Sequence, residues 1–360
     1  MRIIFRVDAS LKMGSGHVMR CLALAEQLKT MKSVIEFICR EHDGHLIKKI
    51  QNSGFKVRSL QNKLNSKCDT RLFHSDWLSV TQEKDSDDCI NALGVDKFDW
   101  LIVDHYSLDE EWEKKLKRYC SKILVIDDLA DRKHSCDILI DQTYGRKKDS
   151  YKALVPSKCI ILVGSKYALL RNEFKKNRNN AITKRKSNFI LQNILISLGG
   201  MDPQNLSGKI LYELTKVNWK TNLKINLISG VESNHKEYLE KFRNSMPKNL
   251  KVEIFQNVSN ISELMIIADI AIGAGGGTNL ERCCLGLPSF VLITSENQKE
   301  SSLNLQRAGA IFVKEDYKSI VNEISKLHSE NHININNISN NALNICDGYG
   351  IQRVAGIMTS

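Results

Sequence analysis

Gly14-Ser15-Gly16-His17-Val18-Met19-Arg20 follows an apolar run at residues 3–7 and precedes the helically spaced residues 21–28. This order predicts a strand, a glycine turn and a helix, the unit from which parallel α/β sheets are built. The two glycines allow a sharp turn, and the free N–H groups of the first helical turn attract an anion. The positive end of a helix disfavours an imidazolium, so this position suits a neutral histidine that acts as a base. Alternatively, His17 only caps or packs the helix.

Short β-branched runs alternate with helical stretches along the first half of the chain. These runs lie at residues 3–7, 34–39, 100–104, 123–127, 138–141 and 160–163. The alternation predicts a parallel sheet flanked by helices. Asp8, Asp104 and the pair Asp127-Asp128 stand at the ends of three runs. We therefore expect these carboxylates at the carboxyl edge of the sheet, where ligands bind in open α/β folds.

The same pattern starts again after a basic, asparagine-rich segment. Further strands are predicted at residues 194–200, 223–228, 252–255, 270–272 and 290–293. Because 360 residues exceed one ordinary core, we predict an α/β protein with two Rossmann-like domains that face a cleft. The domains are assigned to residues 1–174 and 190–360, with a solvated linker at 175–189. The last helix has the option of returning to the first domain.

Composition narrows the class of protein. A hydrophobic content of 42% suits a globular chain, no apolar run approaches the about 20 residues of a membrane span, and no signal peptide is evident. Ten cysteines without a CxxC pair predict buried, reduced thiols, with Cys283-Cys284 on a helix. We therefore expect a cytoplasmic protein. The net charge of +11 is dispersed and lacks interleaved aromatic residues, which argues against nucleic acid and favours attraction of phosphorylated metabolites or an anionic membrane face.

A second glycine turn stands in the other half of the chain, at Gly275-Gly276-Gly277-Thr278. Its backbone amides are predicted to hold a diphosphate, and Glu281, one helical turn later, to reach the hydroxyls of a ribose. The turn lacks the Gly-Lys-Ser/Thr of a P-loop. The first glycine turn likewise lacks the third glycine of a dinucleotide fingerprint, because Met19 stands there. A turn that serves only close packing remains the alternative.

Two further segments are expected at the same edges. Gly199-Gly200-Met201 follows the first strand of the second half, and Asn297-Gln298 follows its last predicted strand. Together with the two glycine turns they predict a cleft suited to a sugar nucleotide.

The ordered motifs of the chain resemble a known family. They run from Phe5-Arg6-Val7-Asp8 and the His17 segment through Asp76-Trp77-Leu78, Val103-Asp104-His105-Tyr106, Ile126-Asp127-Asp128, Tyr167-Ala168-Leu169-Leu170-Arg171 and Ser197-Leu198-Gly199-Gly200 to the second glycine turn and Asp347-Gly348-Tyr349-Gly350. The chain is similar over nearly its whole length to the UDP-2,4-diacetamido-2,4,6-trideoxy-β-L-altropyranose hydrolases of pseudaminic acid biosynthesis. Their fold resembles that of MurG-type, or GT-B, glycosyltransferases.

The resemblance implies that the C-terminal domain holds UDP, that His17 is the catalytic base and that water attacks the anomeric carbon with inversion. Asp8, Asp104 or His105 is expected to orient His17. Where the family often has a serine near the third glycine, a hydroxyl contact would move to Thr278. The expected substrate contacts are Asp8, Gly14, Ser15, Gly16, Arg20, Asp104, His105, Tyr106, Arg171, Gly199, Gly200, Met201, Asn257, Val258, Gly275, Gly276, Gly277, Thr278, Glu281, Asn297 and Gln298.

No cofactor and no metal are expected, since a diphosphate leaves readily, although Asp104 and Asp127-Asp128 keep a magnesium site open. The expected partner is a UDP-sugar, and the oligomeric state stays open, with a monomer as one option. Two other functions compete with hydrolysis: a glycosyltransferase that uses the same cleft, and a nucleotide-sugar binding module without catalysis.

Overall fold

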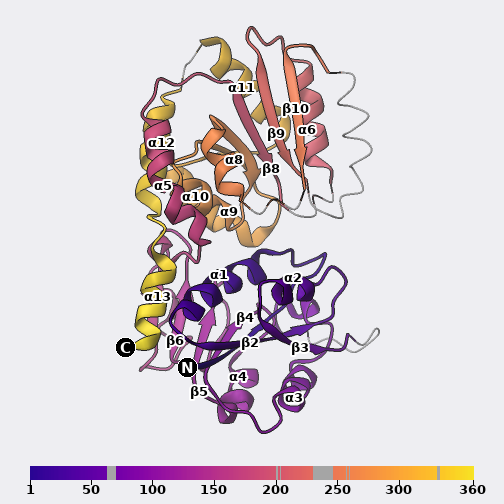
Figure 1. Cartoon of the computed structure of the whole chain (residues 1–360), viewed down its shortest axis with the longest axis vertical. Coiled ribbons are helices and arrows are strands. Elements are labelled where there is room, and N and C mark those ends of the chain that lie inside the picture. The colour runs from indigo at the N-terminus through magenta and orange to yellow at the C-terminus, as the bar shows by residue number, and fades with distance from the viewer. Residues whose placement is uncertain are drawn as a thin grey trace. The chain divides into compact units, whose positions relative to one another are not determined.

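A computed structural model describes residues 1–62, 70–199, 202, 204–229, 246–256, 258, 260–330 and 333–360 (Figure 1). These residues form two compact units. Unit 1 consists of Met1–Arg171 and Tyr349–Ser360, and unit 2 of Asn172–Gly348.

Unit 1 is built on a seven-stranded parallel sheet with the order β3-β2-β1-β4-β5-β6-β7. The strands are β1 (Arg2–Val7), β2 (Val34–Arg40), β3 (Lys56–Leu60), β4 (Phe98–Asp104), β5 (Cys120–Ile126), β6 (Ile138–Asp141) and β7 (Ile160–Val163). The predicted runs form the five central strands and the edge strand β7. The central strands are mostly apolar on both sides because helices cover both faces of the sheet. Ile3 and Phe5 of β1 join one core cluster, while Ile4 between them joins the other.

Helices pack on both faces of this sheet. The helices on the Phe5 face are α1 (Gly16–Thr30), α2 (Ile47–Asn52) and α13 (Gly350–Thr359), and those on the Ile4 face are α3 (Gln82–Leu93) and α4 (Glu110–Leu116). The yellow helix α13 of Figure 1 contacts α1, so the end of the chain belongs to unit 1. Short 3-10 turns stand at Ser75–Trp77, Lys117–Tyr119, Lys148–Tyr151 and Ser165–Tyr167.

Unit 2 contains a six-stranded parallel sheet with the order β10-β9-β8-β11-β12-β13. Its strands are β8 (Asn193–Ser197), β9 (Leu223–Ile228), β10 (Leu250–Phe255), β11 (Ile270–Ala274), β12 (Ser289–Leu292) and β13 (Phe312–Lys314). Its described helices are α5 (Asn172–Arg185), α6 (Leu206–Thr215), α8 (Ile261–Ile267), α9 (Thr278–Cys284), α10 (Lys299–Arg307), α11 (Tyr317–Glu330) and α12 (Ile335–Ile345), and a 3-10 turn spans Glu296–Gln298. Cys283 and Cys284 are buried on α9, as predicted.

The prediction of a solvated linker at residues 175–189 is wrong. Most of that segment belongs to helix α5, which packs on α8 and α9 within unit 2. Two of its arginines serve that packing: Arg178 donates to the carbonyl oxygens of Leu343 (2.8 Å) and Cys346 (2.9 Å), and Arg185 donates to that of Met265 (2.7 Å). The sequence could not predict these contacts. An arginine that donates to backbone carbonyl groups and an arginine that is exposed to solvent look the same in a basic segment.

Two strands were not predicted. Strand β3 carries the polar residues Lys56, Arg58 and Ser59, and β13 has only three residues. Both lie at an edge of their sheet, where one side of the strand is not paired and a continuous apolar run is not required.

Candidate active site

His17 lies at the start of α1, above the carboxyl end of β1. Gly14, in the left-handed region with a φ of 75°, donates its N–H to Ser10 O (2.8 Å) and closes the turn. Helix α1 begins at Gly16, so His17 is its second residue, as predicted. The His17 side chain retains 11% of its exposure and can therefore meet a ligand or a water molecule.

Asp104 is the carboxylate that contacts His17. Strand β4 pairs directly with β1, with Val7 beside Asp104, which brings the end of β4 under the first turn of α1. His17 Nδ1 lies 2.6 Å from Asp104 Oδ1. A carboxylate accepts from this nitrogen, so the proton belongs on Nδ1 and the lone pair on Nε2. The geometry therefore selects the tautomer that a general base needs.

Arg20 holds the same carboxylate from the next turn of the helix. Its Nε lies 2.6 Å from Asp104 Oδ2 and its Nη2 lies 2.6 Å from Asp104 Oδ1, a bidentate pair. Its Nη1 donates to Asp128, which also accepts from the Tyr106 hydroxyl at 3.0 Å. Arg20 was expected to bind substrate, but its guanidinium is engaged by these two carboxylates. These contacts are those of a side chain that holds Asp104 in place.

The electrostatics keep Asp104 ionised. Its side chain has no exposed surface, which alone would raise its pKa, but Arg20 and His17 hold the pKa of this carboxyl well below its usual range. Asp104 and Asp128 in turn outweigh the burial of Arg20 and raise the pKa of its guanidinium. Burial and the neighbouring Asp128 raise the pKa of Tyr106, so its hydroxyl stays protonated. The group is thus a fixed set of charges next to a neutral phenol.

Aromatic rings form a wall beside His17. The His17 ring meets Tyr106 edge to face at 4.6 Å, and Trp77 stacks on Tyr106 with centroids 5.6 Å apart. His74 lies 4.3 Å from Trp77, and burial lowers the pKa of His74. Sequence reasoning named Tyr106 but gave His74 and Trp77 no role in the site. The only signal was that Asp76-Trp77-Leu78 belongs to the family motifs.

Of the three alternatives for orienting His17, Asp104 contacts its ring, whereas Asp8 and His105 contact each other and other residues. Asp8 is buried and accepts from Arg6 Nη1 at 2.6 Å and from the backbone N–H of Arg40 at 2.7 Å. His105 Nε2 lies 3.3 Å from Asp8 Oδ2. These two residues therefore belong to a separate buried ion cluster below the site, although they follow neighbouring strands as predicted.

That cluster continues through Asp85 on α3. Asp85 pairs with Arg6 (2.7 Å) and Arg40 (2.7 Å) and accepts from the indole nitrogen of Trp112 (3.0 Å). Arginines hold the pKa values of both Asp8 and Asp85 below the ordinary range despite their burial. The cluster ties β1, β2 and α3 together under the site.

Unit 1 is expected to unfold before unit 2 when the protein is acidified. Asp8, Asp85 and Asp104 have lowered pKa values, and the pKa of Asp127, beside Arg132, is lowered to about 2. A lowered pKa in the folded state adds stability above the unfolded pKa of about 4, and that stability is lost as the pH falls through this value toward the folded pKa.

Tryptophan fluorescence separates the two units in this experiment. Trp219 is the one tryptophan of unit 2, and the other three belong to unit 1. In unit 2, the described carboxyls with a lowered pKa, Glu253 and Asp316, lie near the surface and add little. Urea unfolding at pH 7 and pH 3.5 would be compared with and without Trp219→Phe. An equal loss of stability in both units would contradict the prediction.

The second glycine turn connects β11 to α9 in unit 2. Gly275 donates its N–H to Gln298 Oε1 (3.1 Å), which also accepts from the backbone N–H of Thr294 (3.1 Å). A Cβ on Gly275 would stand 2.5 Å from Ser302 Oγ, so this position requires glycine. Gln298 thus lies at the turn, as expected, and its amide oxygen braces the backbone. Asn297 is exposed and accepts from Ser295 Oγ at 2.6 Å.

Two more of the expected contacts in unit 2, Gly199 and Val258, follow strands of the same sheet. β8 pairs with β11, with Ser197 beside Gly273, so Gly199 and Gly275 each come two residues after this pair. Val258 follows β10, and Glu281 lies half-buried on α9. Arg171 is the last residue of the first segment of unit 1. Gly200, Met201 and Asn257 lie outside the described residues.

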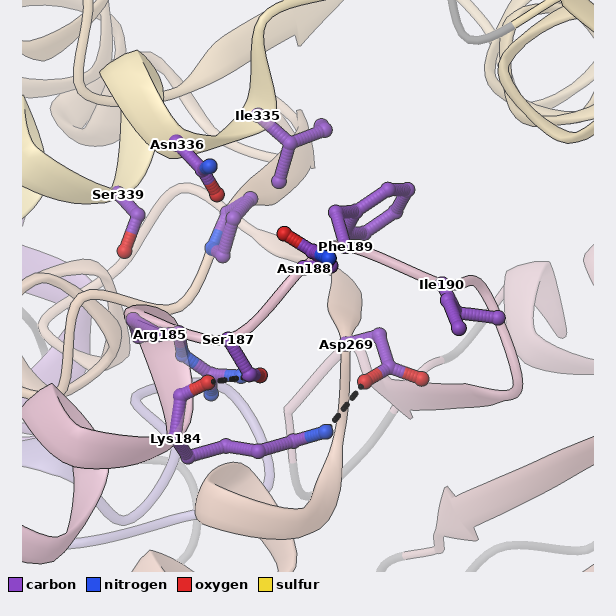
Figure 2. A pocket seen from close by; sticks show the side chains of 11 residues that line it. Lys184, Arg185, Ser187, Asn188, Phe189, Ile190, Asp269, Ile335, Asn336 and Ser339 are labelled. Atoms are coloured by element: carbon purple, nitrogen blue, oxygen red, sulfur yellow. Dashed lines mark hydrogen bonds and ion pairs between the residues drawn. The ribbon is translucent and has the colours of Figure 1, made fainter.

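A pocket in unit 2 lies at the amino ends of the strands, on the side of the sheet away from the glycine turn (Figure 2). Lys184 of α5 pairs there with Asp269 at 3.1 Å. Asp269 precedes β11 and accepts from the backbone N–H of Asn193 at 2.8 Å, whereas the glycine turn follows β11. The pocket therefore marks the amino ends of the strands and is separate from the expected ligand edge.

Comparison with known proteins identifies the family. No protein-family model matches the chain. A curated protein of Campylobacter jejuni, named UDP-2,4-diacetamido-2,4,6-trideoxy-β-L-altropyranose hydrolase, is 30% identical over 266 residues, which cover 74% of this chain and 81% of that protein. The chain belongs to the family of this hydrolase. The family resemblance read from the sequence motifs is thereby confirmed.

Two further similarities bear on length and fold. The protein MJ1062 of Methanocaldococcus jannaschii is 31% identical over 302 residues, 83% of this chain but 57% of its own length, so the chain spans little more than half of that relative. The crystal structure of Acinetobacter baumannii MurG has a TM-score of 0.68 at 12% identity and covers 99% of both chains. This likeness confirms the expected class of two Rossmann-like units of the GT-B type.

The described part of the chain contains neither a candidate membrane span nor a candidate metal cluster. No helix in this part of the chain combines the length and the apolar content needed to cross a bilayer. No group of three or more His, Cys, Asp or Glu side chains gathers there as a metal site would require.

Proposed function

We propose that this chain hydrolyses UDP-2,4-diacetamido-2,4,6-trideoxy-β-L-altropyranose, with UDP bound at the glycine turn of unit 2 and His17 of unit 1 as the general base. The family membership supports the substrate. The single observation that carries the mechanism is the 2.6 Å contact between His17 Nδ1 and Asp104. A histidine that only packed its helix would not need a buried, ionised carboxylate fixed in turn by an arginine.

His17 Nε2 takes a proton from water while the water oxygen forms a bond to the anomeric carbon. The bond between that carbon and the diphosphate oxygen breaks at the same time, and its electron pair leaves with UDP. Attack from the side opposite UDP inverts the anomeric configuration. Asp104 stabilises the imidazolium that forms, as in other base–carboxylate pairs. Backbone amides of the glycine turn stabilise the growing charge on the diphosphate.

The test is UDP release in the absence of any acceptor. The purified chain, given the UDP-sugar in water enriched in oxygen-18, is expected to release UDP promptly, to place the heavy oxygen on the sugar and to form first the anomer inverted at that carbon. Nuclear magnetic resonance and mass spectrometry read these outcomes. UDP release that requires an added sugar or lipid acceptor would instead show a glycosyltransferase, and tight UDP binding without turnover a binding module.

A panel of UDP- and CDP-linked sugars with different acyl groups sharpens the assay. The highest kcat/KM is expected for the UDP-linked 2,4-diacetamido sugar. A CDP-linked sugar that reacts faster would contradict the nucleotide assignment while leaving the role of His17 intact.

A further inference from the structure

Arg282 on α9 is a buried cation for which the described residues supply no ion-pair partner. Arg6, Arg40 and Arg282 are all among the largest fully buried side chains of the described residues. Arg6 and Arg40 each pair with Asp85 at 2.7 Å. No carboxylate in the described part of the chain lies within ion-pair distance of Arg282. A buried charge is costly unless it is paired, so the position that Arg282 occupies in the fold calls for an explanation.

The guanidinium of Arg282 is packed against the start of the glycine turn. Its Nη2 donates to Ala274 O at 2.9 Å and also to Asn279 Oδ1, while its Nε has no partner in the structure. A Cβ on Gly273 would stand 2.7 Å from the guanidinium carbon, so glycine is required here to admit the cation. Residues 273 and 274 end β11 and lead directly into Gly275-Gly276-Gly277.

The cation stays charged at neutral pH even without a partner. Burial lowers the pKa of Arg282 to about 10, and the neighbouring Cys283 and Glu281 offset only part of that shift. The protein therefore places a positive charge of low hydration directly behind the turn. In such surroundings the field of a charge is screened less than at the surface.

We propose that Arg282 is a positioning residue of the nucleotide site, whose buried charge attracts the diphosphate of the ligand and whose hydrogen bonds hold the end of β11. This inference rests on the proposed function, because it assigns the anion to the diphosphate of UDP. The missing counter-charge is supplied by the ligand and not by the chain. A purely structural arginine would brace the turn equally well for ligands with and without phosphate.

The discriminating measurement is the affinity for UDP relative to uridine, by calorimetry. Arg282→Met is expected to weaken UDP binding by about tenfold or more and to leave uridine binding nearly unchanged, since only UDP carries the charge. Arg282→Lys keeps the charge and is expected to retain most of the preference for UDP. Arg282→Gln, whose amide can still donate to Ala274 O, provides the same comparison should the Met variant not fold.

Arg185 offers a matched control in the same unit. It too donates to backbone carbonyls, those of Met265 (2.7 Å) and Ala268 (2.6 Å), and burial lowers its pKa to about 10, but it lies at the opposite edge of the sheet. Arg185→Met should keep the full preference for UDP. If folded Arg282→Met still prefers UDP over uridine, the proposed role of Arg282 is wrong, but the nucleotide site is not contradicted. A wild-type chain that binds UDP no better than uridine would contradict the nucleotide site itself.

Discussion

Replacement of His17 by Asn is expected to reduce kcat for UDP release by about a thousandfold and to change the affinity for UDP by less than about threefold. The amide has a similar size but cannot accept a proton from water at neutral pH. The loss should therefore appear in kcat and not in binding, because the proposed function assigns the attacking water to His17 and the nucleotide to unit 2. Stopped assays of UDP release and calorimetric titration with UDP measure the two quantities.

The control for this variant is His45→Asn. His45 lies exposed in unit 1, and its ring Nδ1 accepts a hydrogen bond from the backbone N–H of Ile47 at 3.4 Å. Its replacement should leave kcat unchanged. Turnover by the His17 variant at close to the wild-type rate would end the assignment of the general base, whatever the affinity for UDP.

Replacement of Asp104 by Asn is expected to lower kcat by about 10²- to 10⁴-fold. An asparagine amide can donate to His17 Nδ1, which would move the imidazole proton to Nε2 and remove the lone pair that faces water. The carboxylate also accepts twice from Arg20 at 2.6 Å, so the change frees that guanidinium as well. Nitrogen-15 spectra of the His17 ring would report the change of tautomer directly.

Loss of stability has to be separated from loss of chemistry in this variant. Removing one partner of a buried ion pair costs about 3–5 kcal/mol, so Asp104→Asn is also expected to lower the melting temperature of unit 1. Asp99→Asn, on the same strand but exposed, is the control for the strand. A folded Asp104→Asn chain that retains the wild-type kcat and the wild-type tautomer would show that Asp104 does not orient the base.

The sequence predicted every central strand of the two described sheets and two of their four edge strands, β7 and β10, but not the edge strands β3 and β13. Strands β1, β4 and β11 are continuous apolar runs because both faces of each are covered, and such runs stand out in a sequence. β3 and β13 at the sheet edges carry too few apolar residues to do so. Helix α5 was mistaken for a linker because its composition shows charge but not the carbonyl groups that its arginines contact.

The candidate site shows the same division. The motif around His17 identified the residue and its helix position, since a glycine turn between a strand and a helix is local. Asp8, Asp104 and His105 were equal candidates to orient His17, because the end of a strand says nothing about which way its last side chain points. In the structure, β4 pairs with β1 so that Asp104 contacts His17, whereas Asp8 is buried and pairs with Arg6.

By itself, the sequence determined the parallel α/β class, the family and the position of His17, because these depend on periodicity and on short motifs along the chain. Only the tertiary structure decided that Asp104, Arg20 and Asp128 form one hydrogen-bonded group around His17 and that none of the described carboxylates pairs with Arg282. Contacts between distant residues depend on strand order and side-chain direction. Neither strand order nor side-chain direction can be predicted from the local pattern of a single sequence.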